Sequence, residues 1–392
     1  MEAANVALVF IGFMGAGKTS AARAAAVALG ARAVDADQEI ERRAGSTIEE
    51  YFAAHGEAAF RALEEDVVAA LLERPPAPVL SLGGGAVGSP RVRELLRRHT
   101  VVLLDVDVDT AWRRAGNKRR PLARDRARFV ALHAERAPLY DAVADAVLAD
   151  SSRDQVRPAV PALRSLPRGV KLLWATAASG SYPVHVGEGL LGSGFWPVAG
   201  RRFAITDETV GGLYDVPDAA AELRVPPGEQ HKTLASAERL LRGLAAAGMA
   251  HDDHVVALGG GVVGDLAGFC AAVYQRGVRV VQVPTTLVAQ VDSAYGGKTG
   301  VDLPEGKNYA GAYHQPAAVL VDPSTMATLP QAELAAGWAE VIKTALIAGG
   351  ALWERVRGGA ALDSDVVLAC ARTKLAVVAA DERDSGRRQV LN

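Results

Sequence analysis

The segment that most constrains the fold is GFMGAGKT, residues 12–19, which follows an apolar run that begins at Val6. It fits the pattern G-x-x-x-x-G-K-[ST], and the residues after it have helical spacing. A glycine loop between a strand and a helix offers its amides to phosphate oxygens, with Lys18 on the β- and γ-phosphates and the Thr19 hydroxyl on Mg²⁺. The alternative, a glycine-rich turn in a Rossmann-like domain, requires neither the lysine nor the threonine. The segment therefore predicts a P-loop.

The composition is that of an ordinary globular protein of two or three domains. The chain has 392 residues, is 49% hydrophobic and 22% charged, and carries a formal net charge of −2. We therefore expect no nucleic acid and no membrane as partner. Cys270 and Cys370 form no disulfide or metal-binding spacing, which predicts a cytoplasmic protein. We also expect no signal peptide and no transmembrane helix, because the N-terminal run leads into glycines and lacks a basic region.

Apolar and helical segments alternate in the order typical of an α/β fold with a parallel sheet. The first series runs from VALVFIGF near the N-terminus to TVVLLDVD at residues 100–107. Residues 151–169 lose this periodicity and contain three prolines, which predicts a linker between domains. A second α/β series starts at YPVHVG, and after Leu329 the pattern becomes helical only.

Further motifs follow the P-loop in the first series. Two carboxylates in VDAD, Asp35 and Asp37, come at the end of an apolar strand, and we expect one to serve Mg²⁺ and the other a substrate hydroxyl. Then come FRALEE, LSLGGG, RRPL and ERAPLY. A P-loop kinase for a small anionic polyol needs arginines for the acceptor and a basic lid over ATP.

In this order, the motifs of residues 5 to about 150 resemble those of shikimate kinase. The resemblance implies that Asp37 orients or deprotonates the acceptor hydroxyl, that Thr19 and Asp35 serve Mg²⁺, and that Lys18 is catalytic. It implies transfer of phosphate from ATP to shikimate, giving shikimate 3-phosphate, with Arg120 as a catalytic lid arginine. The implied ATP-binding residues are Gly12, Gly15, Ala16, Gly17, Lys18, Thr19, Ser20, Arg114 and Arg120, and the implied shikimate-binding residues are Asp37, Arg61, Gly83, Gly84, Gly85 and Arg136.

A second glycine segment, ALGGGVVGDL at residues 257–266, differs from the P-loop because Asp265 stands where a lysine is required. Alone it fits many dinucleotide folds, or simply close packing of a strand on a helix. The segments around it are more informative, and they are PPGEQHKT, VPTT, QVDSAYGGKTGVD, EGKN and AEVIK. Only eight of the 43 basic residues are lysines, and four of those eight lie in these neighbouring segments. Clustered ammonium groups suit a phosphorylated, polyhydroxylated substrate.

From about residue 180 onward these segments look like 3-dehydroquinate synthase. The resemblance implies NAD- and metal-dependent conversion of 3-deoxy-D-arabino-heptulosonate 7-phosphate to 3-dehydroquinate and phosphate, with Lys298 and Lys343 catalytic. The implied NAD-binding residues are Asp207, Glu229, Lys232, Gly260, Gly261, Val262, Val263, Gly264, Asp265, Thr285, Thr286, Lys298, Lys307 and Thr328. The implied substrate-binding residues are Arg276, Asp292, Lys298, Asn308, Lys343, Lys374, Arg388 and Asn392.

The metal implied by this resemblance is Zn²⁺ or Co²⁺, with Glu340 as one ligand. The family's two histidine ligands lie in a G-H-T-x-G-H-A segment just after R-x-x-L-N, and the printed sequence stops at RRQVLN. A catalytic zinc needs three protein ligands, so we expect an incomplete site in a truncated chain.

Two hypotheses follow for the whole chain. The first is a bifunctional enzyme of chorismate biosynthesis that uses MgATP in one half and NAD⁺ and a metal in the other. The second is an active kinase fused to a synthase-like binding or dimerisation module without turnover. We expect small-molecule substrates and a homodimer through the second half. The predicted domains are a kinase domain over 1–160, a linker over 161–172, an NAD-binding α/β domain over 173–328 and a partial helical domain over 329–392.

Overall fold

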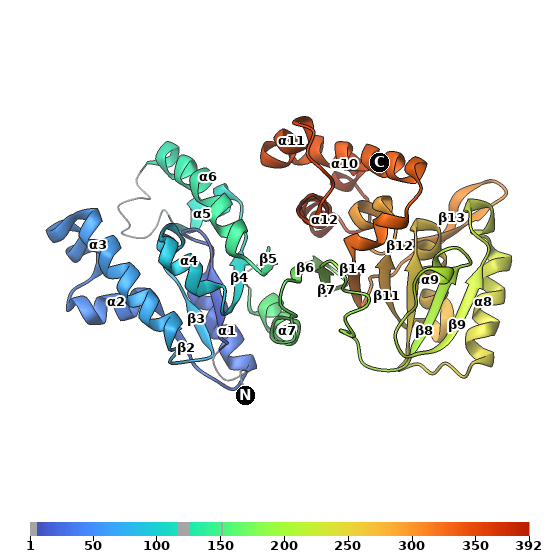
Figure 1. Ribbon diagram of the computed structural model, residues 1–392, viewed down its shortest axis with the longest axis horizontal. Coiled ribbons are helices and arrows are strands. Elements are labelled where there is room, and N and C mark those ends of the chain that lie inside the picture. Colours follow the sequence, from blue (N-terminus) through green and yellow to red (C-terminus); the bar gives the residue numbers. More distant parts are fainter. Residues whose placement is uncertain (1–5, 116–124, 150–151, 392) are drawn as a thin grey trace. The chain divides into compact units, whose positions relative to one another are not determined.

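A computed structural model describes residues 6–115, 125–149 and 152–391 (Figure 1). The chain forms two compact units, Met1–Leu166 and Pro167–Asn392. Each unit is an α/β structure, and the second ends in helices, so the predicted fold class is confirmed. The predicted arginine lid falls in residues 116–124 and, like Asn392, lies outside the described residues.

The first unit is built on a parallel sheet whose strands lie in the order β2-β3-β1-β4-β5. Every residue of β1, β3 and the last four of β4 is buried, as expected for a sheet covered on both faces. The strand bounds are β1 Leu8–Ile11, β2 Ala33–Asp35, β3 Val79–Ser81, β4 Thr100–Leu104 and β5 Ala146–Leu148. Because the strands are parallel, the loops that follow β1, β2 and β3 open at one edge of the sheet.

The helices of the first unit flank this sheet (Figure 1). Their bounds are α1 Lys18–Ala28, α2 Ala36–Ala44, α3 Ile48–Glu73, η2 Ala86–Gly88, α4 Pro90–Leu96, α5 Val108–Ala115, α6 Arg126–Val143 and α7 Arg153–Arg164. The long helix α3 begins with a capping box, in which Thr47 and Glu50 satisfy each other's backbone amides. It bends at Gly56, whose φ of 81° is not helical.

The segment 151–169, in which the sequence shows no clear periodicity, is mostly helical in the structure. Residues 153–164 form α7, and residues 165–170, which include a turn at 168–169, connect it to β6. Val156, Ala159, Val160 and Leu163 are buried, with the three- and four-residue spacing of one helix face, and α7 packs against α1. Pro158 and Pro161 lie inside the helix and disguise this pattern, because each removes a backbone donor.

The second unit has a larger sheet with the order β6-β7-β14-β11-β10-β8-β9. Strands β6 and β7 form an antiparallel pair, and the pairs from β7 to β9 along that order are parallel. A separate antiparallel hairpin joins β12 and β13. The bounds are β6 Lys171–Ala177, β7 Gly180–Val186, β8 Arg202–Asp207, β9 Ala219–Val225, β10 His254–Gly259, β11 Arg279–Pro284, β12 Lys298–Leu303, β13 Gly306–Tyr313 and β14 Ala318–Val321.

Helices α8 and α9 cover one face of this sheet and bury a core of aliphatic side chains from β8, β10 and α9. Helices α10, α11 and α12 follow the last strand and group together, as Figure 1 shows in orange and red. The helix bounds are η4 Val210–Gly212, η5 Glu229–His231, α8 Leu234–Ala246, α9 Gly261–Val273, η6 Tyr274–Arg276, η7 Ala289–Ser293, η8 Pro323–Thr328, α10 Gln331–Ala348, α11 Gly350–Arg357, α12 Ser364–Ala380 and η9 Arg387–Leu391.

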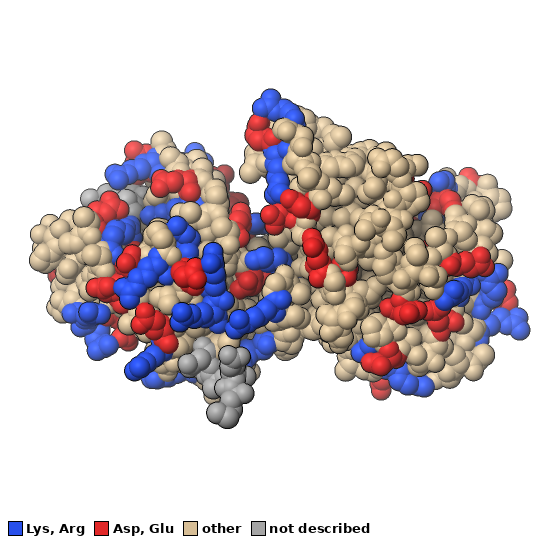
Figure 2. Space-filling view, viewed as in Figure 1, with Lys and Arg blue, Asp and Glu red and all other residues tan. Residues whose placement is uncertain are grey.

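Charged side chains of both signs are interspersed on the face drawn in Figure 2, in line with the net charge of −2. Within the described residues, no helix combines the length and the apolar character that crossing a lipid bilayer requires.

The buried His185 on β7 gives a testable pH dependence. Its side chain is 0% exposed, its ring stacks edge-on against Phe195, and neither ring nitrogen has a hydrogen-bond partner among the described residues. Burial lowers the pKa of His185 from 6.5 to about 4. The unfolded chain therefore binds more protons than the folded chain between those two values, and stability falls as the pH drops through this window.

Replacing His185 with leucine is expected to remove this contribution. The wild-type second unit should lose about 2–3 kcal/mol more stability than His185→Leu between pH 7 and pH 4.5. Urea unfolding at several pH values measures the difference, and His251→Gln, at an exposed position, is the control. Parallel pH curves for wild type and His185→Leu would contradict a neutral buried imidazole.

Candidate active sites

The P-loop connects β1 to α1 and has the backbone that a phosphate cradle needs. Gly15 and Gly17 have φ values of 82° and 87°, a region that favours glycine. A Cβ on Gly15 would lie 2.5 Å from the backbone oxygen of Ala111. Helix α1 begins at Lys18, and no side chain caps its first amides. Those amides and the positive end of the helix dipole are thus directed at the loop, where they can bind phosphate oxygens.

The cations and carboxylates around this loop suit magnesium-bound nucleotide. The Lys18 ammonium donates a hydrogen bond to the backbone oxygen of Phe13 at 3.1 Å, so it curls over the loop. The Thr19 hydroxyl donates to Asp35 Oδ2 at 2.5 Å, and Asp35 also caps α2 through the amide of Asp37. A hydroxyl and a carboxylate at this separation are oxygen ligands that fit Mg²⁺. Ala16, Ser20 and Arg114 lie in the loop, on α1 and on α5 respectively.

A cavity of about 360 Å³ lies between α3, the loop after β3 and α6. Arg61 lines it and donates to Glu64 Oε2 at 2.5 Å, and a second arginine, Arg136, lines it from α6. Burial raises the pKa of Glu64 although the Arg61 guanidinium opposes the rise. The cavity thus offers two guanidinium groups, which suit a small carboxylate.

The glycines of the loop after β3 touch these groups directly. A Cβ on Gly83 would lie 2.8 Å from both Asp37 Oδ1 and Glu64 Oε1, and one on Gly85 would lie 2.2 Å from Arg61 Nη1. Side chains larger than hydrogen would therefore displace the charged groups of the site. The structure brings together Asp37, Arg61, the three glycines and Arg136, which the resemblance to shikimate kinase assigns to one binding site.

The second glycine segment forms the junction between β10 and α9. Helix α9 begins at Gly261, and its N-cap Gly260 offers no side chain to the first amides. A Cβ on Gly260 would lie 2.8 Å from the Thr286 side chain, and one on Gly261 would lie 3.1 Å from Ser293 Oγ. The glycines thus let Thr286 and Ser293 pack closely against a helix N-terminus that no side chain caps. This N-terminus lies at the carboxyl end of a parallel strand, where dinucleotide phosphates bind in α/β sheets. Val262, Val263, Gly264 and Thr285 flank the same junction.

Lys232 connects the glycine segment to the β12–β13 hairpin. Its side chain is 4% exposed, and its ammonium lies 3.1 Å from Glu229, 3.2 Å from Asp265 and 3.7 Å from Asp302. It also donates to Asn308 Oδ1 at 2.8 Å. Burial lowers the pKa of Lys232, but the carboxylates, Asp265 first, outweigh burial and raise it. Burial raises the pKa of Asp265 to about 6, with Lys232 opposing.

A second polar cluster surrounds Asp292, which lies in the π-helical turn η7. Lys374 on α12 donates to Asp292 Oδ1 at 2.6 Å, and the Lys343 ammonium lies 3.9 Å from the same oxygen. Lys343 is also paired with Glu340 and donates to the backbone oxygen of Leu391 at 2.7 Å. Burial lowers the pKa of Lys374, and Asp292 opposes that effect.

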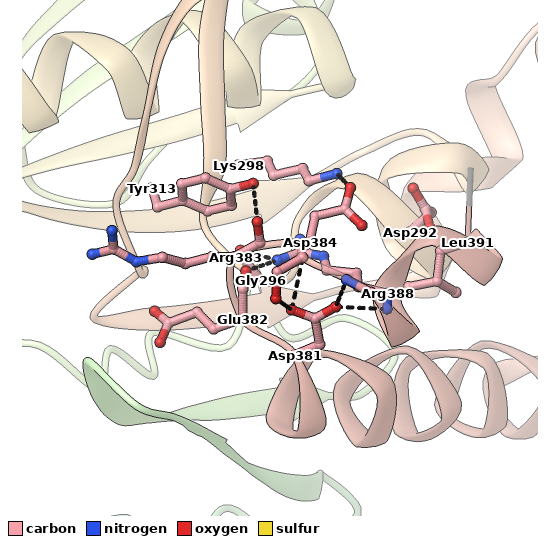
Figure 3. A network of polar contacts seen from close by, with 12 residues as sticks. Asp292, Gly296, Lys298, Tyr313, Asp381, Glu382, Arg383, Asp384, Arg388 and Leu391 are labelled. Carbon is pink, nitrogen blue, oxygen red and sulfur yellow. Dashed lines mark hydrogen bonds and ion pairs between the residues drawn. The ribbon is translucent and has the colours of Figure 1, made fainter.

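The turn between α12 and η9 carries a further set of charged side chains that make polar contacts (Figure 3). The Lys298 ammonium lies 2.6 Å from Asp384 Oδ2. The Arg388 side chain is buried and donates to the backbone oxygens of Gly296 and Glu382. The Asp381 carboxylate accepts hydrogen bonds from the amides of Ser385, Gly386 and Arg388, and so shapes the turn.

Comparison with protein families decides what the two units are. Residues 14–163 match the family model for shikimate kinase, residues 222–336 that for 3-dehydroquinate synthase N-terminal, and residues 337–392 that for 3-dehydroquinate synthase C-terminal. The chain joins a shikimate kinase domain to a 3-dehydroquinate synthase region. The predicted fusion of these two families is therefore confirmed.

Individual proteins are similar to parts of the chain. A 3-dehydroquinate synthase of Halorhodospira halophila is 46% identical over 236 residues, which are 56% of this chain and 66% of that protein. The chain thus spans slightly less than two thirds of that curated relative. A crystal structure of 2-deoxy-scyllo-inosose synthase with carbaglucose-6-phosphate, NAD⁺ and Co²⁺ aligns with a TM-score of 0.52 and 25% identity, over 56% of this chain and 67% of that one. Shikimate kinase from Acinetobacter baumannii in complex with shikimate aligns with 34% identity over 42% of this chain and 93% of that one, with a TM-score of 0.38.

Not every residue predicted for the synthase site contacts Lys232 or Asp292 within the described part of the chain. Asp207 ends β8 and accepts hydrogen bonds from the amides of Thr209 and Val210. Thr328 bonds to the Tyr214 hydroxyl, and Lys307 pairs with Glu229 at 3.4 Å from an exposed position. Arg276 lies in η6 with a φ of 71°. The roles of these residues remain predictions.

The residues around Glu340 do not fit a catalytic zinc in the part of the chain that the structure describes. That part contains no group of three or more histidine, cysteine, aspartate or glutamate side chains that could hold a metal ion. The Glu340 carboxylate is instead engaged by the Lys343 ammonium. A three-ligand site is therefore not formed by these residues.

Sequence reasoning missed two acidic contacts and one phenol. Asp384 binds Lys298, Glu382 accepts from the amide of Ser179 at 3.0 Å, and Tyr140 donates to the backbone oxygen of Gly84. The run DERD at 381–384 and the final tyrosine of ERAPLY were visible in the sequence. Their partners are far away along the chain, so the local pattern gave no role.

Proposed function

We propose that the first unit transfers the γ-phosphate of MgATP to the 3-hydroxyl of shikimate. The observation that carries this proposal is the contact between the two loops of the site. A Cβ on Gly84 would lie 3.4 Å from Gly12 O and 3.6 Å from Met14 N, so the carboxylate-binding loop lies against the P-loop. A phosphate donor on one loop and an anionic acceptor beside the other would thus be neighbours, which removes much of the entropic cost of the reaction.

The predicted site residues of the first unit have distinct roles in this proposed reaction. Arg61 and Arg136 hold the carboxylate of the acceptor, and Asp37 orients the hydroxyl and accepts its proton as the oxygen attacks the γ-phosphorus. The bond from that phosphorus to the bridging oxygen of ADP breaks. Lys18 and the P-loop amides stabilise the charge on the phosphate oxygens, while Thr19 and Asp35 hold Mg²⁺.

An assay of ADP release with and without shikimate tests the proposal, and Arg61→Lys sharpens it. An ammonium cannot reproduce a bidentate fork, so the KM for shikimate should rise about 10- to 100-fold with little change in the KM for ATP. Arg91→Lys, at an exposed position outside the cavity, is the matched control. A wild-type chain that folds but releases no ADP in response to shikimate would refute the assignment.

For the second unit we propose NAD⁺ binding at the N-terminus of α9 and an anionic, phosphorylated substrate beside Lys298, Lys343, Lys374 and Arg388. The open amides of α9 and the clustered cations support both parts. NAD⁺ would supply a hydride acceptor for a substrate alcohol, and the substrate would be 3-deoxy-D-arabino-heptulosonate 7-phosphate, the product 3-dehydroquinate.

The alternative is a binding or dimerisation module without turnover. Two measurements distinguish the proposals: NAD⁺ titration of the protein, and phosphate release from the heptulosonate phosphate. Both positive results support the synthase; NAD⁺ binding without phosphate release supports the module. Light scattering tests the proposed homodimer, and a monomer would refute that part.

A further inference from the structure

Helix α6 brings two donors to a single acceptor in the kinase site. Arg136 and Tyr140 are four residues apart on α6 and therefore lie on the same face. Arg136 Nη1 donates to the backbone oxygen of Gly84 at 3.1 Å, and the Tyr140 hydroxyl donates to the same oxygen at 2.6 Å. Of the two, the Tyr140 bond is the shorter.

Gly84 is also the point where the glycine loop 83–85, which follows β3, lies against the P-loop. The position of a Cβ on Gly84 is 3.6 Å from Tyr140 Oη, 3.4 Å from Gly12 O and 3.6 Å from Met14 N. The peptide of Gly84 is therefore held between α6 on one side and the P-loop on the other. A shift of this peptide would change the distance between phosphate donor and acceptor.

Tyr140 is built to remain in this position. Its side chain is 4% exposed, and burial raises its pKa to about 12, so it is a neutral phenol that donates a hydrogen bond at physiological pH. Arg136 is different, because it lines the cavity and has further N–H groups that can bind a carboxylate there. The Tyr140 hydroxyl, with a single O–H group, donates to the Gly84 oxygen.

We propose that Tyr140 is a positioning residue that holds the glycine loop 83–85 against the P-loop while Arg136 binds the substrate carboxylate. This proposal rests on the proposed kinase function for its kinetic consequence, but its structural consequence does not. Tyr140 contacts no substrate in this arrangement. It acts through the backbone of Gly84.

The variant Tyr140→Phe keeps the ring and removes only the hydroxyl. The KM for shikimate should rise about 3- to 10-fold, the change that corresponds to one net hydrogen bond, while the KM for ATP stays within about twofold. In hydrogen–deuterium exchange, peptides covering residues 82–90 should exchange faster, while peptides of β1 and β4 should not change. Tyr51→Phe on α3 is the matched control, since that ring packs on His55 outside the cavity.

The outcomes distinguish a positioning role of Tyr140 from a general structural role and from a failure of the proposed kinase function. Unchanged exchange in residues 82–90 would overturn it whatever the substrate is. Faster exchange with unchanged KM values, or an equal loss for ATP and shikimate together with a lower melting temperature, would overturn it in favour of a general structural role. A wild-type chain without shikimate-dependent turnover would refute the kinase function alone, and the exchange data would still decide the role of Tyr140.

Discussion

Replacing Lys18 with alanine is expected to abolish phosphate transfer while leaving the fold intact. The Lys18 ammonium curls over the P-loop, 3.1 Å from the backbone oxygen of Phe13, at the first position of α1. There the ammonium can stabilise the negative charge that develops on the phosphate oxygens in the transition state. This electrostatic interaction is stronger in the transition state than in the ground state. Its loss should lower kcat by at least about 10³-fold, or roughly 4 kcal/mol.

Two measurements check this prediction: the rate of ADP release, which gives kcat, and a thermal melt, which shows whether the fold is intact. Arg23→Ala, at an exposed position on the same helix, is the control and should retain wild-type turnover. Lys18→Arg should also be poorly active, because a planar guanidinium does not fit where a compact ammonium is cradled. A kcat within tenfold of wild type for Lys18→Ala would mean that the loop does not carry the reacting phosphate.

The sequence predicted the parts of these sites that are local. The P-loop and the second glycine segment both lie at strand–helix junctions. Each junction is determined by its glycines and by the apolar run just before them, which are close together in the sequence. The sequence also distinguished the second glycine segment from a P-loop, because Asp265 stands where a P-loop requires a lysine. The individual site residues came from resemblance to two families, and the structure shows which of them share a cluster without testing their roles.

The parts that could not be predicted depend on the tertiary structure. The helix α7 was hidden because Pro158 and Pro161 disguise its apolar face, which is stabilised by packing on α1. The pair Lys298–Asp384 joins positions 86 residues apart, and the geometry of η7 as a π-helical turn is set by contacts around Gln290. No short window of sequence contains such partners.

Replacing Lys232 with methionine is expected to destabilise the second unit strongly. The Lys232 ammonium is buried beside Glu229, Asp265 and Asp302, and it donates to Asn308. Removing it leaves partly buried carboxylates without their cation, since the side chains of Asp265 and Asp302 are 21% and 18% exposed. Breaking a fully buried ion pair costs about 3–5 kcal/mol, and we expect the lower end of that range here because water screens these carboxylates in part. For a unit of this size that corresponds to a fall in melting temperature of about 10 °C.

Lys307→Met is the matched control for this experiment. Lys307 also pairs with Glu229, but its side chain is 74% exposed, so water replaces the lost contact and the melting temperature should change by no more than about 2 °C. Equal effects of the two substitutions would show that burial of Lys232 does not matter to stability.

The pH dependence of the Lys232→Met defect gives a second, independent check. Burial already raises the pKa of Asp265 from 3.8 to about 6 while Lys232 opposes the rise, so removing Lys232 should raise that pKa further. A carboxyl with a raised folded-state pKa loses stability as the pH rises from its unfolded value through its folded value. The difference in melting temperature between wild type and Lys232→Met should therefore be small near pH 5 and largest near pH 8. A difference that is the same at both pH values would show that the lost packing of the lysine stem, and not the unpaired carboxylates, causes the defect.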